Sequence, residues 1–311
     1  MTDLASASVG LEPAVVQADT ERAEDDGIKR KKLPFGTYLA GAWMIALIVA
    51  ILGASYLPLS DPNASIGGLK EIAPFQVSGH PLGGDGNGRD LLARTIYGAR
   101  ISMEVAVCAV LFGLLIGGAL GLLSGYYRGR VGNVLVSLFD ILLAIPPLVL
   151  ALALVAVLKG DPSADNGLPT VLILIIALGV VSIPILARIT RANTLAWAQR
   201  DFVTAARAQG AKNSRIILRE ILPNVLPAMI SISLLGIAVT IIAEGGLGIL
   251  GVSVEPPTAT WGTIIADGRT ALRDSPFIVF VPCIAIFLTV LSLNYLGDVV
   301  RDRFDVRESA L

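Results

Sequence analysis

The sequence predicts an all-α integral membrane protein with six transmembrane helices, from its composition, its long apolar blocks and its uneven distribution of basic residues. Of the 311 residues, 54% are hydrophobic and 16% are charged, whereas an ordinary soluble domain carries about 25% charged residues. Several apolar blocks reach the roughly 20 residues that a helix needs to cross about 30 Å of hydrocarbon. With a net charge of −1 and no basic domain, the chain does not resemble a nucleic-acid-binding protein.

The chain begins with a predicted cytoplasmic tail, residues 1–32, ahead of a transmembrane domain over residues 33–311. Residues 1–27 are polar and acidic and cannot bury enough apolar surface to fold, so we expect the tail to be largely disordered. A basic run, Lys29 to Lys32, precedes the first apolar block. That block is longer than the apolar core of a typical secretory signal, and we interpret it as a retained first helix.

Six blocks are expected to cross the bilayer, with tilt absorbing their differences in length. They run roughly over residues 38–57, 102–126, 134–158, 170–187, 225–250 and 277–297. If the N-terminus is inside, 17 of the lysines and arginines fall on the inner side and 7 on the outer side. Because basic residues concentrate in cytoplasmic segments, both termini are predicted to lie in the cytoplasm.

The second predicted span has a glycine at every fourth position, which places these glycines on one helix face. They are Gly113, Gly117, Gly121 and Gly125. Without side chains, this face allows another helix to approach closely and to gain van der Waals contact that lipid cannot supply. Packing within the chain is the favoured interpretation, and a contact with another subunit is the alternative.

Two carboxylates, Asp140 and Glu244, fall inside predicted spans. A charge at membrane depth is costly, so it normally faces a protein interior or a water-filled path. We expect Glu244 to lie near the outer interface, beside Gly245 and Gly246, where water can solvate it. Asp140 either anchors helices or lines a translocation path.

The sequence predicts no catalytic residues, no metal site and no cofactor bound by this chain. It contains no GxxxxGK[ST] phosphate loop, and neither a nucleophile elbow nor an HExxH motif. The lone His80 lies in a Gly/Pro-rich polar loop without a second ligand, and Cys108 and Cys283 lie far apart in apolar blocks. We therefore expect a protein that is not itself an enzyme.

The long connection over residues 188–224 is too polar to span the membrane and is predicted to contain two helices. The first covers about 201–209 and ends at Gly210, since glycine readily adopts the left-handed conformation of a helix C-terminal turn. Leu222 and Pro223 are expected to break the chain before the fifth span. A short helix on a cytoplasmic loop is a suitable docking element for a soluble partner.

The same connection resembles the EAA loop of ATP-binding-cassette importer permeases. The resemblance covers RDFVTAARAQG, from Arg200 to Gly210, and IILREILPN, from Ile216 to Asn224. Further stretches resemble the C-type subunit of dipeptide and oligopeptide permeases, and together with the loop they cover residues 35–307 in the order of that subfamily. These are His80 to Asp85 with Gly88 to Asp90 and Ile96 to Ser102, Asp140 with Leu143 to Pro146, Pro256 to Thr258 with Trp261-Gly262 and Ala266 to Arg269, and Asn294 with Leu296 to Asp298 and Arg301-Asp302.

The resemblance implies a type I importer permease fold in a bacterial cell membrane, with a cytoplasmic coupling helix that binds the ATPase. The coupling residues it implies are Asp201, Phe202, Thr204, Ala205, Ala206, Gly210, Leu222 and Pro223. Thr204 departs from the pattern, because it stands where the EAA motif has its acidic residue. The implied partners are a second homologous permease subunit, two ATPase subunits that hold ATP and Mg²⁺, and an extracytoplasmic binding protein.

The implied cargo is a di- or oligopeptide, with nickel or glutathione as alternatives, because importers for these cargoes share the same motifs. A secondary transporter driven by an ion gradient is the alternative from another class. It would call for paired carboxylates or unwound helices at mid-membrane depth together with inverted repeats, and the sequence has no convincing internal repeat.

Overall fold

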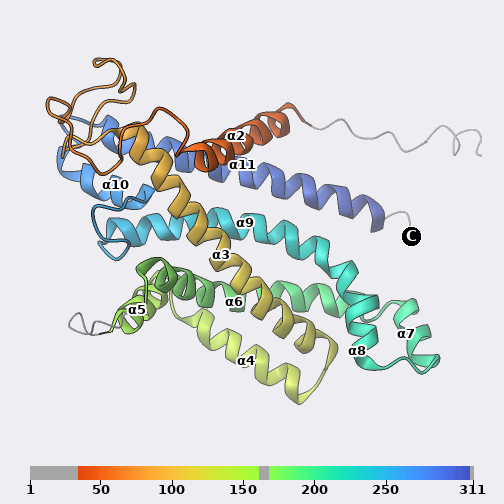
Figure 1. Cartoon of the computed structure of the whole chain (residues 1–311). Coiled ribbons are helices and arrows are strands. Elements are labelled where there is room, and N and C mark those ends of the chain that lie inside the picture. Colours follow the sequence, from red (N-terminus) through yellow and green to blue (C-terminus); the bar gives the residue numbers. More distant parts are fainter. Residues whose placement is uncertain (1–33, 161–167, 309–311) are drawn as a thin grey trace, which may run out of the picture. The chain divides into compact units, whose positions relative to one another are not determined.

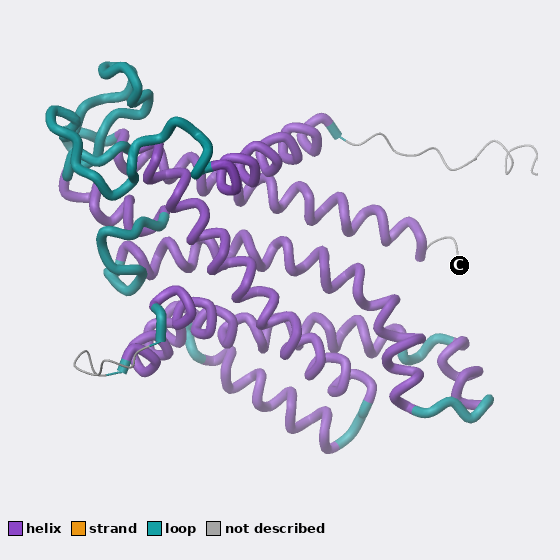
Figure 2. Tube along the Cα trace, in the orientation of Figure 1, coloured by secondary structure: helices purple, strands orange, loops and turns teal. Residues whose placement is uncertain are grey.

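The computed structural model describes residues 34–160 and 168–308, and the predicted disordered tail over 1–32 lies outside them. Within the described residues the regular structure is helical (Figures 1 and 2). The helices are α2 (Phe35–Gly53), α3 (Leu91–Tyr126), α4 (Arg130–Ala144), α5 (Pro147–Lys159), α6 (Thr170–Trp197), α7 (Asp201–Ala208), α8 (Asn213–Arg215), a π-helix (Ile216–Ile221), α9 (Leu222–Ile249), α10 (Trp261–Gly268), a 3-10 helix (Arg269–Ala271) and α11 (Phe277–Glu308).

Five helices in the described part of the chain are long and apolar enough to cross a membrane, and a bent pair supplies a possible sixth crossing. The five are α2, α3, α6, α11 and the continuous helix Asn213–Ile249. The span predicted over 134–158 is instead two helices, α4 and α5, which meet at an angle of 91°. Proline explains the break, because Pro146 disfavours a helical conformation at Ile145 and neither Pro146 nor Pro147 can donate a backbone hydrogen bond.

The start of α9 also differs from expectation, because the chain passes Leu222 and Pro223 without leaving the helix. The turn before them is a π-helix, in which the Leu222 N–H donates to the carbonyl of Ile217, five residues back. A π-turn is wider than an α-turn, which makes room for the proline ring. Pro223 itself has no N–H to donate to that turn, so the helix continues across one missing backbone hydrogen bond.

The glycine face of α3 packs against α6 at backbone distance. A Cβ atom at Gly117 would lie 2.5 Å from the carbonyl oxygen of Ile183, and one at Gly121 would lie 2.6 Å from that of Ala187. Cβ atoms at Gly113 and Gly125 would lie 2.7 Å from the Cβ atoms of Ser182 and Thr194. All four glycines are buried, so they are covered by α6 of the same chain.

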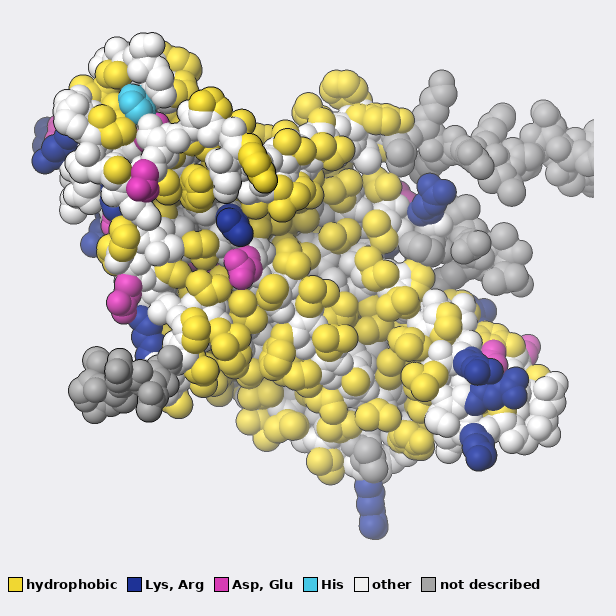
Figure 3. Space-filling view, viewed as in Figure 1, with side chains coloured by type: hydrophobic (Ala, Val, Ile, Leu, Met, Phe, Trp, Pro, Cys, Tyr) yellow, Lys and Arg dark blue, Asp and Glu magenta, His cyan; other side chains and the backbone are white. Residues whose placement is uncertain are grey.

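The exposed surface of the long helices is largely apolar. Figure 3 shows hydrophobic side chains over the middle of the molecule and charged side chains gathered at its two ends. Leu115 on α3, Val239 on α9 and Phe287 on α11 are each more than half exposed. Such a band costs little free energy against lipid tails, whereas in water it would drive aggregation.

We predict that Gly117→Ala lowers the thermal stability of the purified protein in detergent, because the added methyl group has no space against the backbone of α6. Overpacking of this kind costs about 1–3 kcal/mol. Gly41→Ala on α2 is the matched control, since a Cβ there meets nothing within 4 Å. Equal melting temperatures for the two variants would contradict the close packing of α3 on α6.

Candidate functional site

Helix α7 projects from one end of the molecule, beyond the ends of α3, α6 and α9 (Figure 1). It is eight residues long, and Val203 is its fully buried side chain. Val203 belongs to a buried apolar cluster that includes Tyr126 of α3 and Ile216 and Ile221 of the π-helix. The helix is therefore attached to the transmembrane helices through one face and leaves the other face free.

The coupling residues expected on α7 occupy that free face. Asp201, Phe202, Thr204 and Ala205 are exposed, and Ala206 is half-buried at the edge of the Val203 cluster. Of the two coupling residues expected further along the chain, Leu222 packs against the same cluster and Pro223 is exposed. The structure thus brings Leu222 and Ala206 to one cluster, and places Pro223 on the surface.

Gly210 ends α7 in the turn that the sequence predicts. Its φ is +79°, in the left-handed region that favours glycine. The Gly210 N–H donates to the carbonyl of Arg207 at 2.9 Å, and the Ala211 N–H donates to that of Ala206 at 3.0 Å. This pair of hydrogen bonds is the Schellman motif, which satisfies the last carbonyls of a helix. A Cβ atom at Gly210 would meet nothing within 4 Å.

Aromatic side chains join α7 to the neighbouring helices, a feature the sequence analysis missed. The Arg207 guanidinium lies 5.3 Å from the ring centroid of Tyr126, and the Tyr126 hydroxyl donates to Asn213 Oδ1 at 2.8 Å. On the other side, the rings of Phe202 and Trp197 are 6.1 Å apart. A cation over an aromatic face contributes about 0.5–1 kcal/mol where it is exposed. These contacts connect α7 to the ends of α3 and α6.

Glu244 is not solvated, and the expectation that it meets water at the outer interface is wrong. It is fully buried and accepts hydrogen bonds from the hydroxyls of Ser102 on α3 at 2.8 Å and Ser253 at 3.1 Å. Its burial follows from the close approach of α10, where a Cβ at Gly262 would lie 2.8 Å from the Cα of Gly245. Glu244 therefore links α3, α9 and the segment that follows α9.

Asp140 has the opposite environment. It lies on the exposed side of α4, and within residues 34–160 and 168–308 no hydrogen bond or ion pair involves its carboxylate. Asp140 was expected either to anchor helices or to line a translocation path. Among the described residues, the structure shows no partner through which Asp140 would anchor a helix.

The other end of the molecule holds a buried cluster of alternating charges, which the sequence analysis also missed. Asp85 accepts from Arg89 Nε at 2.7 Å and lies 3.2 Å from Arg94 Nε. Asp267 on α10 lies 3.1 Å from Arg89 Nη2 and 3.5 Å from Arg94 Nη2. Asp85 and Arg94 are almost fully buried. Because Asp267 comes from a distant part of the chain, these ion pairs fasten the segment before α3 to α10.

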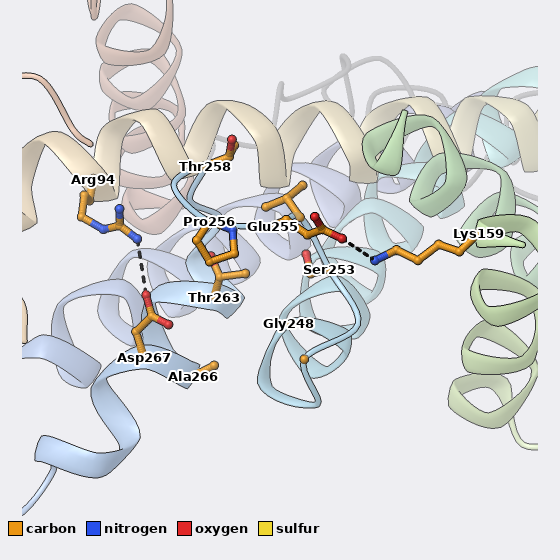
Figure 4. Close-up of a pocket in the computed structure, with 12 residues that line it drawn as sticks. Arg94, Lys159, Gly248, Ser253, Glu255, Pro256, Thr258, Thr263, Ala266 and Asp267 are labelled. Atoms are coloured by element: carbon orange, nitrogen blue, oxygen red, sulfur yellow. Dashed lines mark ion pairs between the residues drawn. The ribbon is translucent and has the colours of Figure 1, made fainter. Parts of the chain in front are cut away.

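Beside this cluster lies a small cavity of about 240 Å³. Figure 4 shows Arg94 and Asp267 on one of its sides and the ion pair of Lys159 with Glu255, 3.5 Å apart, on another.

His80 lies close to Asp85 in sequence but contacts a different carboxylate, because its Nδ1 is 2.6 Å from Asp90 Oδ2. Asp90 in turn accepts from the N–H groups of Leu92 and Ala93 and caps α3. Among the described residues, no group of three or more His, Cys, Asp or Glu side chains could hold a metal ion.

Comparison with known proteins decides the family. Residues 117–309, more than half of the chain, match the family of binding-protein-dependent transport system inner membrane components. The chain belongs to this family. It is therefore a permease subunit of an ATP-binding-cassette transporter and a multi-pass protein of the inner membrane, not the catalytic subunit.

Several curated relatives of this inner membrane component are similar over most of their length. The dipeptide transport system permease protein DppC of Alkalihalophilus pseudofirmus is 37% identical over 84% of the chain and 81% of the relative. The glutathione transport system permease protein GsiD of Pectobacterium atrosepticum is 35% identical over 86% and 85%. A putative peptide transport system permease protein of Brucella suis is 34% identical over 99% and 98%.

Solved structures support the fold of this permease subunit. A chain of the MetNI methionine ABC transporter, in an inward-facing conformation, superposes with a TM-score of 0.56 at 19% identity. The match covers 68% of this chain and 95% of the MetNI chain. At that identity the likeness shows the type I importer permease fold alone.

We predict that Asp85→Ala strongly destabilises the protein, because it leaves the buried guanidinium groups of Arg89 and Arg94 short of a partner. Removing one partner from a buried ionic cluster costs about 3–5 kcal/mol. Asp274→Ala removes an exposed carboxylate and should leave the melting temperature in detergent unchanged. An Asp85→Ala variant as stable as Asp274→Ala would contradict the role given to the cluster.

Proposed function

We propose that this chain is the transmembrane subunit of an ATP-driven, binding-protein-dependent importer that moves di- and oligopeptides into the cytoplasm. The observation that carries the proposal is α7, a short helix held at one end of the membrane domain with an exposed face of small residues. Its sequence resembles the coupling loop of such importers. The peptide cargo is supported by the dipeptide permeases among the relatives of the chain.

The proposed complex contains a second homologous permease subunit, two ATPase subunits and an extracytoplasmic binding protein. ATP and Mg²⁺ would be held by the ATPases, since this chain has no phosphate loop in its sequence. The binding protein would deliver the cargo to the outer end of the permease pair. This assembly follows from the family, whose members are inner membrane components of binding-protein-dependent systems.

In this proposal α7 fits a cleft on the ATPase and transmits its movement to the membrane helices. ATP can shift the permease between states only if α7 binds the ATPase differently in each of them. The exposed Ala205 and the half-buried Ala206 permit a close fit, because they carry no long side chain. Thr204 replaces the acidic residue of the motif, so the fit relies on shape at that position. Val203 and Arg207 would then pass the movement to Tyr126 on α3.

Glutathione is the second candidate cargo, because the relatives include glutathione permease subunits of similar identity. The residues of this chain do not distinguish a peptide importer from a glutathione importer, since the extracytoplasmic binding protein selects the cargo. An uptake assay distinguishes the two. Nickel is the third candidate cargo, because nickel importers share the sequence motifs of this chain.

We predict that Gly210→Asp abolishes transport and leaves membrane insertion intact. A side chain at Gly210 meets no atom of this chain within 4 Å, so the added carboxylate acts on whatever docks against α7. Gly210→Asn is the matched control, since asparagine has the same shape, tolerates the left-handed conformation and adds no charge. The measurement is uptake of labelled di- and tripeptides, glutathione and nickel in a strain deleted for this gene.

Rescue of peptide uptake by the wild type and by Gly210→Asn, but not by Gly210→Asp, would support both the cargo and the coupling role. Loss of glutathione or nickel uptake alone in the deletion strain would reassign the cargo. Normal transport by Gly210→Asp would contradict the role of α7.

A further inference from the structure

Helix α4 presents two different faces to its surroundings. It packs mainly against α3 and α6, with Phe139 buried and the opposite side exposed. On that exposed side one row of positions is polar, the polar stripe, made of Asn133, Ser137 and Asp140. The adjacent row is apolar, the apolar stripe, made of Val134, Leu138 and Ile141. Each stripe follows the spacing of three or four residues that keeps side chains on one helix face.

The polar stripe reaches membrane depth. Asp140 lies ten residues after Arg130, where α4 begins, and therefore about 15 Å along the helix axis. For a helix that enters a hydrocarbon layer of about 30 Å at Arg130 and runs along the membrane normal, this distance brings Asp140 near the middle of the layer. The sequence analysis placed the start of the span at residue 134 and so put Asp140 closer to the surface. An ionisable side chain at this depth faces a protein interior or a water-filled path.

The backbone after Asp140 gives a second, independent argument. Helix α4 ends at Ala144 and the chain turns by 91° into α5, and residues Ala144 to Pro147 are all exposed. Pro147 has no N–H, so it cannot donate the helical hydrogen bond to the carbonyl of Leu143. Non-helical backbone at membrane depth is tolerated only where protein buries it or water lines it. The helix C-terminus also carries partial negative charge, which adds to that of Asp140.

We propose that the polar stripe of α4 lines the water-filled translocation path, and that Asp140 and the adjacent C-terminus of α4 attract cationic groups to it. Lipid tails can contact the apolar stripe without cost, whereas the polar stripe and the broken backbone need water. The ligand class is the ammonium group of a passing peptide, a step that rests on the proposed function. The water-lined stripe itself does not depend on the cargo.

The first test is cysteine accessibility in the assembled transporter, in a background with Cys108→Ala and Cys283→Ala. Asn133→Cys, Ser137→Cys and Asp140→Cys report on the polar stripe, and Val134→Cys, Leu138→Cys and Ile141→Cys are the matched controls on the apolar stripe. A water-soluble thiol reagent should label the polar stripe at least about tenfold faster, because the reactive thiolate forms where water reaches the side chain and is suppressed in apolar surroundings. Equal labelling, or a protected polar stripe, would overturn the proposal and indicate that a partner subunit covers this face.

The second test measures the charge effect of Asp140. In Ser137→Cys, a cationic methanethiosulfonate should react several-fold faster than an anionic one, relative to their rates with a free thiol. Adding Asp140→Asn should remove this preference, and adding Asp140→Glu should keep it. A preference unchanged by Asp140→Asn would overturn the role of the carboxylate.

Dipeptide uptake then separates the two proposals. If the labelling pattern holds and Asp140→Asn lowers dipeptide uptake while Asp140→Glu retains it, the ammonium contact is supported. If the labelling pattern holds but the wild type imports no peptide, the proposed cargo fails and the water-lined stripe stands.

Discussion

The fold of this permease depends on the close contact between α3 and α6. Leucine side chains in place of the four glycines would hold the two helix axes apart, and lipid could not fill the space with comparable contact. Gly117 and Gly121 bring α3 within van der Waals reach of α6 backbone carbonyls. Because interiors at this density resist deformation, the two helices act as one rigid pair.

That rigid pair connects the two ends of the molecule. At its start, α3 is capped by Asp90 and fastened by Arg94 to Asp85 and Asp267. At its end, Tyr126 contacts Arg207 of α7 and donates to Asn213 of α8. A displacement of α7 therefore acts on α3, whose other end is fastened by ion pairs to the segment before it and to α10. By contrast α4 packs on one side only, which leaves its polar stripe free to meet water or a partner.

Local signals in the sequence predict part of this structure. The four-residue glycine spacing indicates a packing face, and Gly210 marks the end of α7, because both depend on residues adjacent along one helix. The break between α4 and α5 could have been found from Pro146-Pro147, since neither residue can donate a helical hydrogen bond. The predicted break at Leu222-Pro223 was wrong, although it also rested on a proline. The π-turn before Pro223 accommodates this residue within the helix. Proline therefore marks a candidate break, and the surrounding turn decides it.

Partners distant in sequence explain what could not be predicted. Ser102 and Ser253 satisfy the carboxylate of Glu244, which the close approach of α10 buries, and Arg89 and Arg94 reach Asp267 in a distant part of the chain. No spacing rule connects such residues before the helices are placed. The same holds for Tyr126, whose contact with Arg207 exists only once α7 folds back onto the end of α3.

The central claim is that α7 is the surface that meets the ATPase, and site-specific photo-crosslinking tests it most directly. A photoreactive amino acid at Thr204, on the free face of α7, is compared with one at Phe75, which is exposed in the segment before α3. In membranes that contain the whole transporter, we predict a crosslinked product with the ATPase subunit from position 204 and none from position 75. A product with the ATPase from position 75 but not from position 204 would contradict the account.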